Sequence, residues 1–189
     1  VRGEDGTEVT LTILSNQKTS DVTVTRGALD TSAFYEIRKQ GNVSFGYIEL
    51  STFGTDTAKQ VEIALEMFKK KNIQTLVIDL RDNGGGYLTA ATDILDLFFT
   101  SDEVIYQMKE KNSAAKKYCA ESDKKYEFEN GYILVNENTA SASELTAGAL
   151  QSEKGYQLIG KTTYGKGSAQ TQKTLSDGSV LKYTYAKWM

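Results

Sequence analysis

Strand-like and helix-like apolar patterns alternate along the middle of the chain, and this alternation constrains its fold more than any other feature. Val43–Leu50 and Thr75–Leu80 are predicted strands. Each is followed by apolar residues spaced three or four positions apart, as on one face of a helix: Ala58, Val61, Leu65 and Phe68, then Leu88, Ala91, Leu95 and Phe98. A strand at Tyr132–Val135, a helix over about Ala140–Glu153 and a strand at Tyr156–Ile159 continue the order. Strands that alternate with helices pair in parallel through crossover helices, so an α/β fold is predicted.

Two hairpins are predicted on either side of this α/β region. Val9, Leu11 and Ile13 alternate with threonines before a polar turn, and Val22 and Val24 do so after it, which predicts a hairpin with one buried face. Residues 169–175 and 180–186 flank an Asp-Gly turn signal and form the second hairpin. Residues 27–41 are a weakly patterned connection, and the charged segment 103–130 is expected to contain strands and an exposed excursion.

Composition removes several kinds of chemistry. The 189 residues include no histidine and a single cysteine, Cys119. Ser-His-Asp and Cys-His arrangements, most zinc sites and an internal disulfide are therefore excluded. The formal net charge of −3 provides no field for nucleic acid or an anionic membrane. The chain starts at Val1 without a signal segment, so we expect a fragment whose targeting information is missing.

The segment Asn136–Leu150 places a serine between a buried strand and a helix. Ser141 precedes the first helical turn, where unpaired backbone N–H groups and the helix dipole can receive an oxyanion. The alternative is structural, because Ser141 and Glu144 also form the pattern of a capping box. Ser143 is an equally suitable hydroxyl at this point.

A lysine between two glycines favours the catalytic interpretation of the serine over the structural one. Lys166 lies in Gly160–Gln170, a loop that enters a strand, and neighbouring chain can approach it closely. Desolvation there penalises the ammonium form and favours a neutral amine base. Gln170, four residues later, faces the same side of an extended segment and can orient the amine. Without Ser141, Lys166 would be better interpreted as a solvated loop lysine and Gln170 as a polar strand residue.

A third segment, Asp79–Gly86, ends in three glycines after a buried strand. Glycines let backbone N–H groups turn toward a ligand, so the loop could supply an oxyanion donor or a phosphate cradle. The structural alternative is a tight turn.

Taken together, the three segments resemble those of the C-terminal processing (tail-specific) peptidases, in the same order and with the same interval between Ser141 and Lys166. The matching blocks are Asp79–Leu88, Thr139–Glu144 and Thr163–Gln170. The resemblance runs from about Tyr35 to Tyr185. The family commonly has a proline where this chain has Gly84, which leaves the choice of donor glycine open.

This resemblance implies a fold and a set of roles. It implies an α/β, crotonase-like (ClpP/crotonase-type) core over residues 27–189, truncated at its C-terminus, preceded by a PDZ-domain remnant over residues 1–26. Ser141 would be the nucleophile, Lys166 the base and Gln170 the residue that orients the base. The oxyanion hole would use the N–H of Ala142 and an N–H from Gly85 or Gly86.

The family also implies partners and a location. The chain would be a serine endopeptidase with a Ser-Lys catalytic pair that cleaves polypeptides with accessible C-termini, outside the cytoplasm. No cofactor, metal or nucleic acid is expected, and a homo-oligomer is left open. Two rival interpretations remain: an inactive relative that binds extended peptides beside an exposed strand, and an amidase with the same chemistry.

Overall fold

The computed structural model describes residues 4, 6–15, 18–26, 31–123 and 126–188, and it divides into two compact units. The first unit is Val1–Asp30 and the second is Thr31–Met189. The domain boundary expected between residues 26 and 27 adjoins residues 27–30, which lie outside the described residues. Each unit is described by itself.

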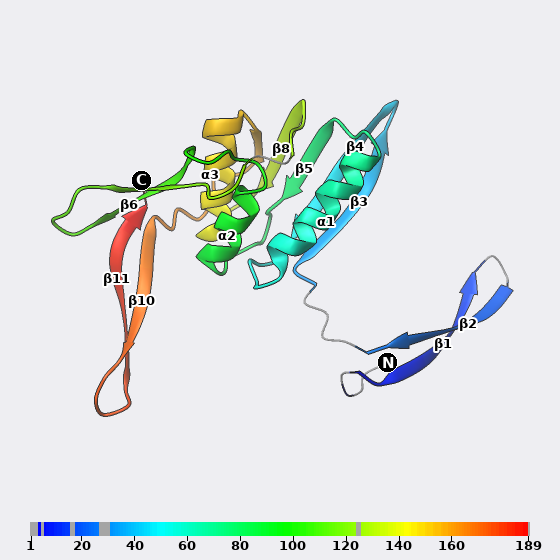
Figure 1. Cartoon of the computed structure of the whole chain (residues 1–189), viewed down its shortest axis with the longest axis horizontal. Coiled ribbons are helices and arrows are strands. Elements are labelled where there is room, and N and C mark those ends of the chain that lie inside the picture. Colours follow the sequence, from blue (N-terminus) through cyan, green and yellow to red (C-terminus); the bar gives the residue numbers. More distant parts are fainter. Residues whose placement is uncertain (1–3, 5, 16–17, 27–30, 124–125, 189) are drawn as a thin grey trace. The chain divides into compact units, whose positions relative to one another are not determined.

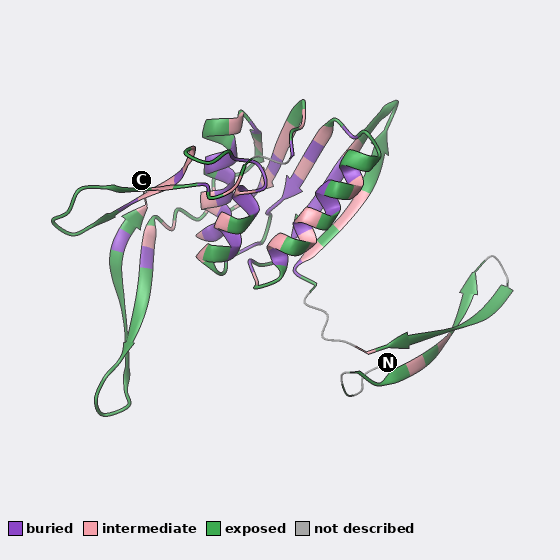
Figure 2. Ribbon diagram, in the orientation of Figure 1, coloured by how far each residue is buried: buried purple, intermediate pink, exposed green. Residues whose placement is uncertain are grey.

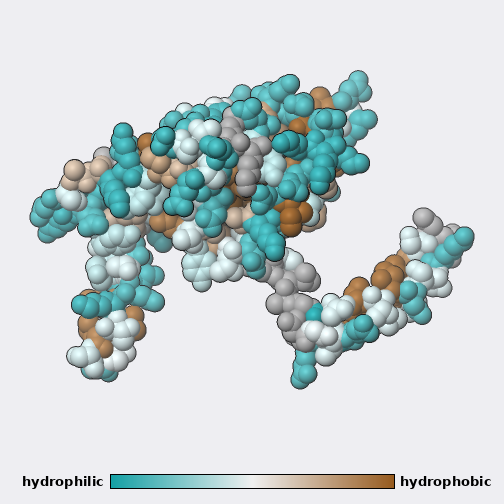
Figure 3. Space-filling view, in the orientation of Figure 1, coloured by the Kyte–Doolittle hydropathy of each residue, from teal (hydrophilic) through white to brown (hydrophobic). Residues whose placement is uncertain are grey.

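The first unit is the predicted N-terminal hairpin. Strands β1 (Glu8–Ser15) and β2 (Lys18–Thr25) pair antiparallel, with Leu11 opposite Val22. Within this unit, Ile13, Val22 and Val24 are exposed, whereas Val9 and Leu11 are half-buried, so the hairpin by itself does not bury the predicted face. Figures 2 and 3 show the ribbon as exposed and its surface as partly apolar. Among the described residues of this unit, no helix or further strand covers an apolar face of the two-stranded ribbon.

A five-stranded sheet forms the centre of the second unit, in the order β3-β4-β5-β8-β9. Its strands are β3 (Ala33–Gln40), β4 (Val43–Leu50), β5 (Thr75–Asp79), β8 (Asn130–Val135) and β9 (Gln157–Gly160). The predicted parallel pairing is confirmed for β4, β5, β8 and β9.

Strand β3 was not predicted, and the expectation of a connection over residues 27–41 is wrong where β3 lies. β3 pairs antiparallel with β4 over its whole length, with Tyr35 opposite Ile48. Its second half is charged and exposed, so it carries little of the apolar alternation that marks a strand. Pairing with β4 stabilises β3 as a strand, although its own sequence pattern does not predict one.

Three helices cover one face of this sheet: α1 (Thr57–Lys70), α2 (Leu88–Leu95) and α3 (Ala142–Lys154) (Figure 1). Buried apolar residues of the helices and of the central strands form one core cluster, and Figure 2 shows buried positions on both layers. The fully buried large side chains include Ile48, Leu65, Phe68, Leu76, Ile78 and Leu95. Each contributes about 1.5–3 kcal/mol by leaving water. This core fixes the ends of β5 and β8, from which the candidate site is built.

A four-stranded antiparallel sheet, in the order β10-β11-β6-β7, lies beside α3. Its strands are β6 (Val104–Glu110), β7 (Lys116–Cys119), β10 (Ser168–Thr174) and β11 (Val180–Trp188). The predicted hairpin with an Asp-Gly turn is β10–β11, and its tip exposes apolar side chains (Figure 3). Its base is packed, because Met108, Ala169 and Ala186 form a small core with Tyr106 and Trp188.

Candidate active site

Two loops leave neighbouring parallel strands at the same edge of the sheet, and this places two of the predicted segments side by side. β5 continues into the loop at residues 80–87, and β8 continues into the loop at residues 136–141. The carboxyl ends of parallel strands are a usual place for ligand sites in α/β proteins. Hydrogen bonds between the loops fix their spacing: the Thr139 hydroxyl donates to Leu80 O at 2.7 Å, and the Ala140 N–H donates to Asn83 O at 3.0 Å.

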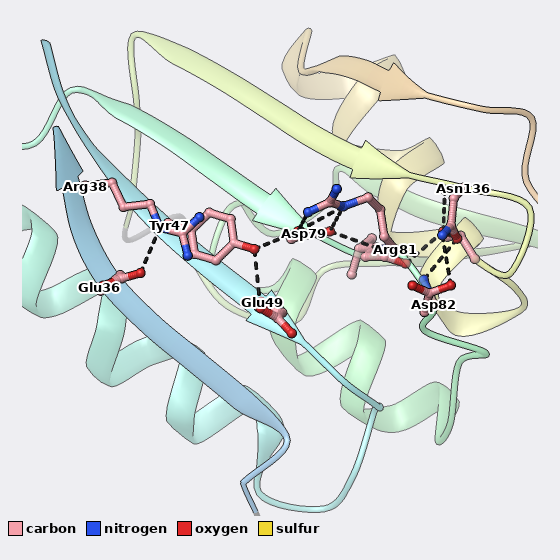
Figure 4. Close-up of polar contacts among 10 residues, drawn as sticks. Glu36, Arg38, Tyr47, Glu49, Asp79, Arg81, Asp82 and Asn136 are labelled. Atoms are coloured by element: carbon pink, nitrogen blue, oxygen red, sulfur yellow. Dashed lines mark hydrogen bonds and ion pairs between the residues drawn. The ribbon is translucent and has the colours of Figure 1, made fainter. Parts of the chain in front are cut away.

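Acidic side chains hold the first loop in place (Figure 4). Buried Asp79 accepts a forked contact from the Arg81 guanidinium, with Oδ2 at 2.6 Å, and a 2.6 Å hydrogen bond from the Tyr47 hydroxyl. Burial alone would raise the pKa of Asp79, but the hydrogen bonds from Arg81 and Tyr47 lower it overall. Asp82 then crosses to the second loop, where it accepts hydrogen bonds from the amides of Asn136 and Asn138 at 2.9 and 2.7 Å.

Ser141 has an unusual backbone conformation at the start of α3. Its φ of 60° and ψ of −117° lie outside the regions that residues with a Cβ normally occupy. Such a conformation costs about 1–3 kcal/mol and occurs mostly at functional sites. Ser143, the alternative hydroxyl, is fully buried and donates to Asn83 O at 3.0 Å. The structure therefore favours Ser141 as the serine that a substrate can reach.

The glycine loop packs directly against Ser141. Gly85 has a φ of 98°, and a Cβ on it would stand 2.7 Å from Ala140 O and 2.9 Å from Ser141 Cβ. Its N–H already donates to the Asn83 side chain at 2.9 Å, so Gly85 is a poor choice as an oxyanion donor. Among the described residues, the N–H groups of Gly86 and Ala142 have no hydrogen-bond partner. Of the two predicted glycines, Gly86 is the one with an available donor.

One carboxylate joins the serine loop to the lysine loop. Glu144, in the first turn of α3, accepts hydrogen bonds from the backbone N–H groups of Ser141 at 2.8 Å, Gly165 at 2.6 Å and Lys166 at 2.9 Å. The Thr163 hydroxyl donates a fourth hydrogen bond, at 2.8 Å. Burial alone would raise the pKa of Glu144, but these four hydrogen bonds lower it below its usual value. Glu144 is therefore held as a carboxylate between the two segments.

Lys166 is half-buried, and within the described part of the chain its ammonium group takes part in no ion pair. It shares a cavity of about 280 Å³ with Ser141 and Gln170. Gly86 and Ala142, which carry the available N–H groups, line the same cavity. The structure thus brings together Ser141, Ala142, Lys166, Gln170 and Gly86.

Residues 44–189 match peptidase family S41. The chain belongs to peptidase family S41.

The S41 assignment agrees with individual relatives. The chain is 35% identical over 190 residues to the carboxy-terminal processing protease CtpA of Bacillus subtilis, and 36% identical over 193 residues to CtpB of the same organism. All of this chain is covered in each case, but only 40% of each relative. In structure it resembles the photosystem II D1 C-terminal processing protease, with a TM-score of 0.73 and 25% identity over 99% of this chain and 52% of that one. The predicted resemblance to C-terminal processing peptidases is confirmed.

Two parts of the candidate site were not foreseen from the sequence. Glu144 was identified only as half of a capping box, whereas its carboxylate also binds the lysine loop 21 and 22 residues away. Asn83 was not singled out, although it is fully buried and its amide bridges Leu50 O and the Gly85 N–H. A polar residue next to a glycine run is the only sequence signal for Asn83, and that signal is common.

Within the described ranges, no cluster of three or more His, Cys, Asp or Glu side chains is arranged to hold a metal ion. Across the same residues, no helix has the length and apolar character needed to cross a membrane.

Proposed function

We propose that this chain is the catalytic core of a serine endopeptidase in which Ser141 is the nucleophile and Lys166 is the general base. One observation carries the proposal. Ser141 stands in a strained conformation at the start of α3, in one cavity with Lys166 and Gln170 and with two backbone N–H groups that have no partner among the described residues. A nucleophile, a base and oxyanion donors are the parts that acyl transfer requires.

The mechanism follows from these parts. Lys166, as the neutral amine, takes the hydroxyl proton of Ser141 while Oγ attacks the scissile carbonyl carbon. The N–H groups of Ala142 and Gly86 stabilise the tetrahedral oxyanion, and losing one such donor typically costs about 3–4 kcal/mol of barrier. Lys166 then gives the proton to the leaving amine, and water hydrolyses the acyl-enzyme with Lys166 again as the base. Gln170 orients the Lys166 amine without adding charge.

We also propose a fold type, a substrate class and a location for this peptidase. The core has the crotonase-like topology of the family, and residues 1–26 are the end of a PDZ domain. The substrates are polypeptides cleaved in their C-terminal regions, outside the cytoplasm, and the protein can assemble as a homo-oligomer. The names of the relatives, which are carboxy-terminal processing proteases, support the choice of substrate.

Degradation of unfolded casein by the full-length protein tests the proposal. We expect Ser141→Ala to abolish turnover without unfolding the protein. Lys166→Arg should also be inactive, because a guanidinium keeps its charge but cannot accept a proton. Lys161→Arg is the matched control, since Lys161 is an exposed lysine of the same segment that pairs with Glu137 at 2.9 Å.

Each outcome distinguishes the rivals. Turnover by Ser141→Ala but not by Ser143→Ala would assign the reaction to the other hydroxyl. A wild-type protein that binds casein without cleaving it would be a non-catalytic peptide binder. Cleavage of small amides without cleavage of casein would indicate an amidase.

A further inference from the structure

A second cavity, of about 430 Å³, is also lined by Ser141 and extends along one face of α3. Leu145, Gly148, Ala149 and Ser152 line it and follow Ser141 by 4, 7, 8 and 11 residues, which is the spacing of a single helix face. The facing walls are Ile105 and Tyr106 of β6, the loop at residues 165–167 and Trp188. Ser141, Lys166 and Trp188 line both cavities, so the two meet at the candidate nucleophile.

Gly148 is the unexpected residue of this face. It lies inside α3, where glycine is less favourable than every other residue except proline. Its backbone does not have a positive φ, so its conformation does not demand glycine. A Cβ built on it meets no atom within 4 Å, so no close packing demands glycine either. The missing side chain leaves open space, and that space is part of the cavity.

The direction of a bound substrate follows from the proposed function, on which this inference rests. When the scissile carbonyl carbon of the substrate is bonded to Ser141, the carbonyl oxygen points to Gly86 and Ala142 in the first cavity. The nitrogen of the scissile bond must be within reach of Lys166. The remaining substituent is the residue whose carbonyl is attacked, and the second cavity, which begins at Ser141 and runs along α3, offers space for its side chain. The lining there includes Ile105, Leu145 and Ala149. The Glu144 carboxylate also lines the cavity, but it is already engaged in four hydrogen bonds.

We propose that this second cavity receives an apolar side chain of the substrate residue on the acyl side of the scissile bond, and that Gly148 sets its depth. Gly148 follows Ser141 by seven residues, which places it about 10 Å along the helix axis. A side chain at this position leans toward the N-terminus of α3, and therefore toward Ser141. Long side chains such as phenylalanine or methionine need the space above Gly148, whereas alanine does not reach it.

Matched peptides that differ only at this residue, with alanine or phenylalanine, test the inference in the full-length protein. We expect Gly148→Leu to lower the ratio of kcat/KM for phenylalanine over alanine by at least about tenfold, the discrimination that one methylene carries in an apolar pocket. Gly148→Ala should change the ratio in the same direction by less and should raise the Tm, because it removes a helix-interior glycine. Gln151→Leu, on an exposed position of the same helix, should leave the ratio unchanged.

The outcomes separate this inference from the proposed function. Suppose that Ser141→Ala is inactive and that Gly148→Leu matches wild type in far-UV circular dichroism and Tm. If Gly148→Leu then preserves the phenylalanine-to-alanine ratio of kcat/KM, or lowers both values equally, Gly148 does not set the depth of the cavity. If Gly148→Leu does not fold, the ratio in Gly148→Ala decides the matter, and an unchanged ratio overturns the inference. If Ser141→Ala is as active as wild type, the proposed function itself fails.

Discussion

Replacing Glu144 by glutamine tests whether one carboxylate holds the two halves of the candidate site together. Oε1 of Glu144 accepts hydrogen bonds from Thr163 and Gly165, and Oε2 accepts them from Ser141 and Lys166. Glutamine has nearly the same shape, but its amide nitrogen cannot accept a hydrogen bond. In either orientation, Glu144→Gln sets that nitrogen against two donors. One pair of hydrogen bonds must be lost.

The size of the effect follows from the number of bonds lost. A hydrogen bond to a charged group contributes about 1.5–3 kcal/mol, so two contribute about 3–6 kcal/mol. Because Glu144 is only partly buried and water can replace part of the interaction, the lower value of about 3 kcal/mol is the expectation. For a domain of this size that lowers the Tm by about 6–12 °C. Displacing Ser141 or Lys166 by about 1 Å would reduce turnover by about a hundredfold.

Thermal unfolding and casein turnover at neutral pH measure both effects. Glu153→Gln is the matched control, because Glu153 is an exposed glutamate of the same helix and should tolerate the change within about 0.5 kcal/mol. The pKa of folded Glu144 is lowered, so its stabilisation is complete above an ordinary glutamate pKa of about 4.3. That stabilisation is lost as the pH falls through the lowered value, and the Tm difference should close in acid. Equal Tm and turnover for wild type and Glu144→Gln at pH 7 would refute the reasoning.

Three further predictions concern the glycine loop, an ion pair at the end of α3 and the need for a metal. Gly85→Ala should lower turnover strongly, because the φ of Gly85 is 98° and the new Cβ would meet Ala140 O at 2.7 Å. Gly84→Ala should be tolerated, because its Cβ meets nothing within 4 Å. Equal turnover for the two variants would contradict this prediction. Lys154 donates to both carboxylate oxygens of Glu103 at 2.7 and 2.6 Å, and this contact, with the Thr100 N–H, lowers the pKa of Glu103 to about 2. Lys154→Met should therefore lower the Tm at pH 7, and the difference in Tm from wild type should shrink as the pH falls from about 4.5 toward 2. Thermal unfolding across that pH range measures this difference. A Tm difference that does not change with pH would contradict the stabilising role of the ion pair. EDTA should leave casein turnover unchanged, and a loss restored by a divalent ion would require a metal in the mechanism.

Elements that are marked by local apolar spacing could be predicted from the amino-acid sequence. Apolar residues three and four apart predicted α1 and α2, and short apolar runs predicted β4, β5 and β8 within about two residues of their observed ends. Periodicity is a property of neighbouring residues, so it can be read without knowing the fold. The order of these elements also predicted parallel pairing, and the three motif blocks indicated the family to which the chain belongs.

Which groups are available for chemistry depends on contacts that only the folded chain makes. Ser141 and Ser143 are equivalent in the sequence, but Ser143 is withdrawn into a hydrogen bond with Asn83 O, 60 residues away along the chain. Gly85 and Gly86 are likewise equivalent until the Asn83 side chain takes the N–H of Gly85. Glu144 binds the lysine loop only because β8, α3 and β9 fold that loop back over the start of the helix. Whether a polar group is free or already paired depends on partners that are distant in sequence, and no local pattern records them.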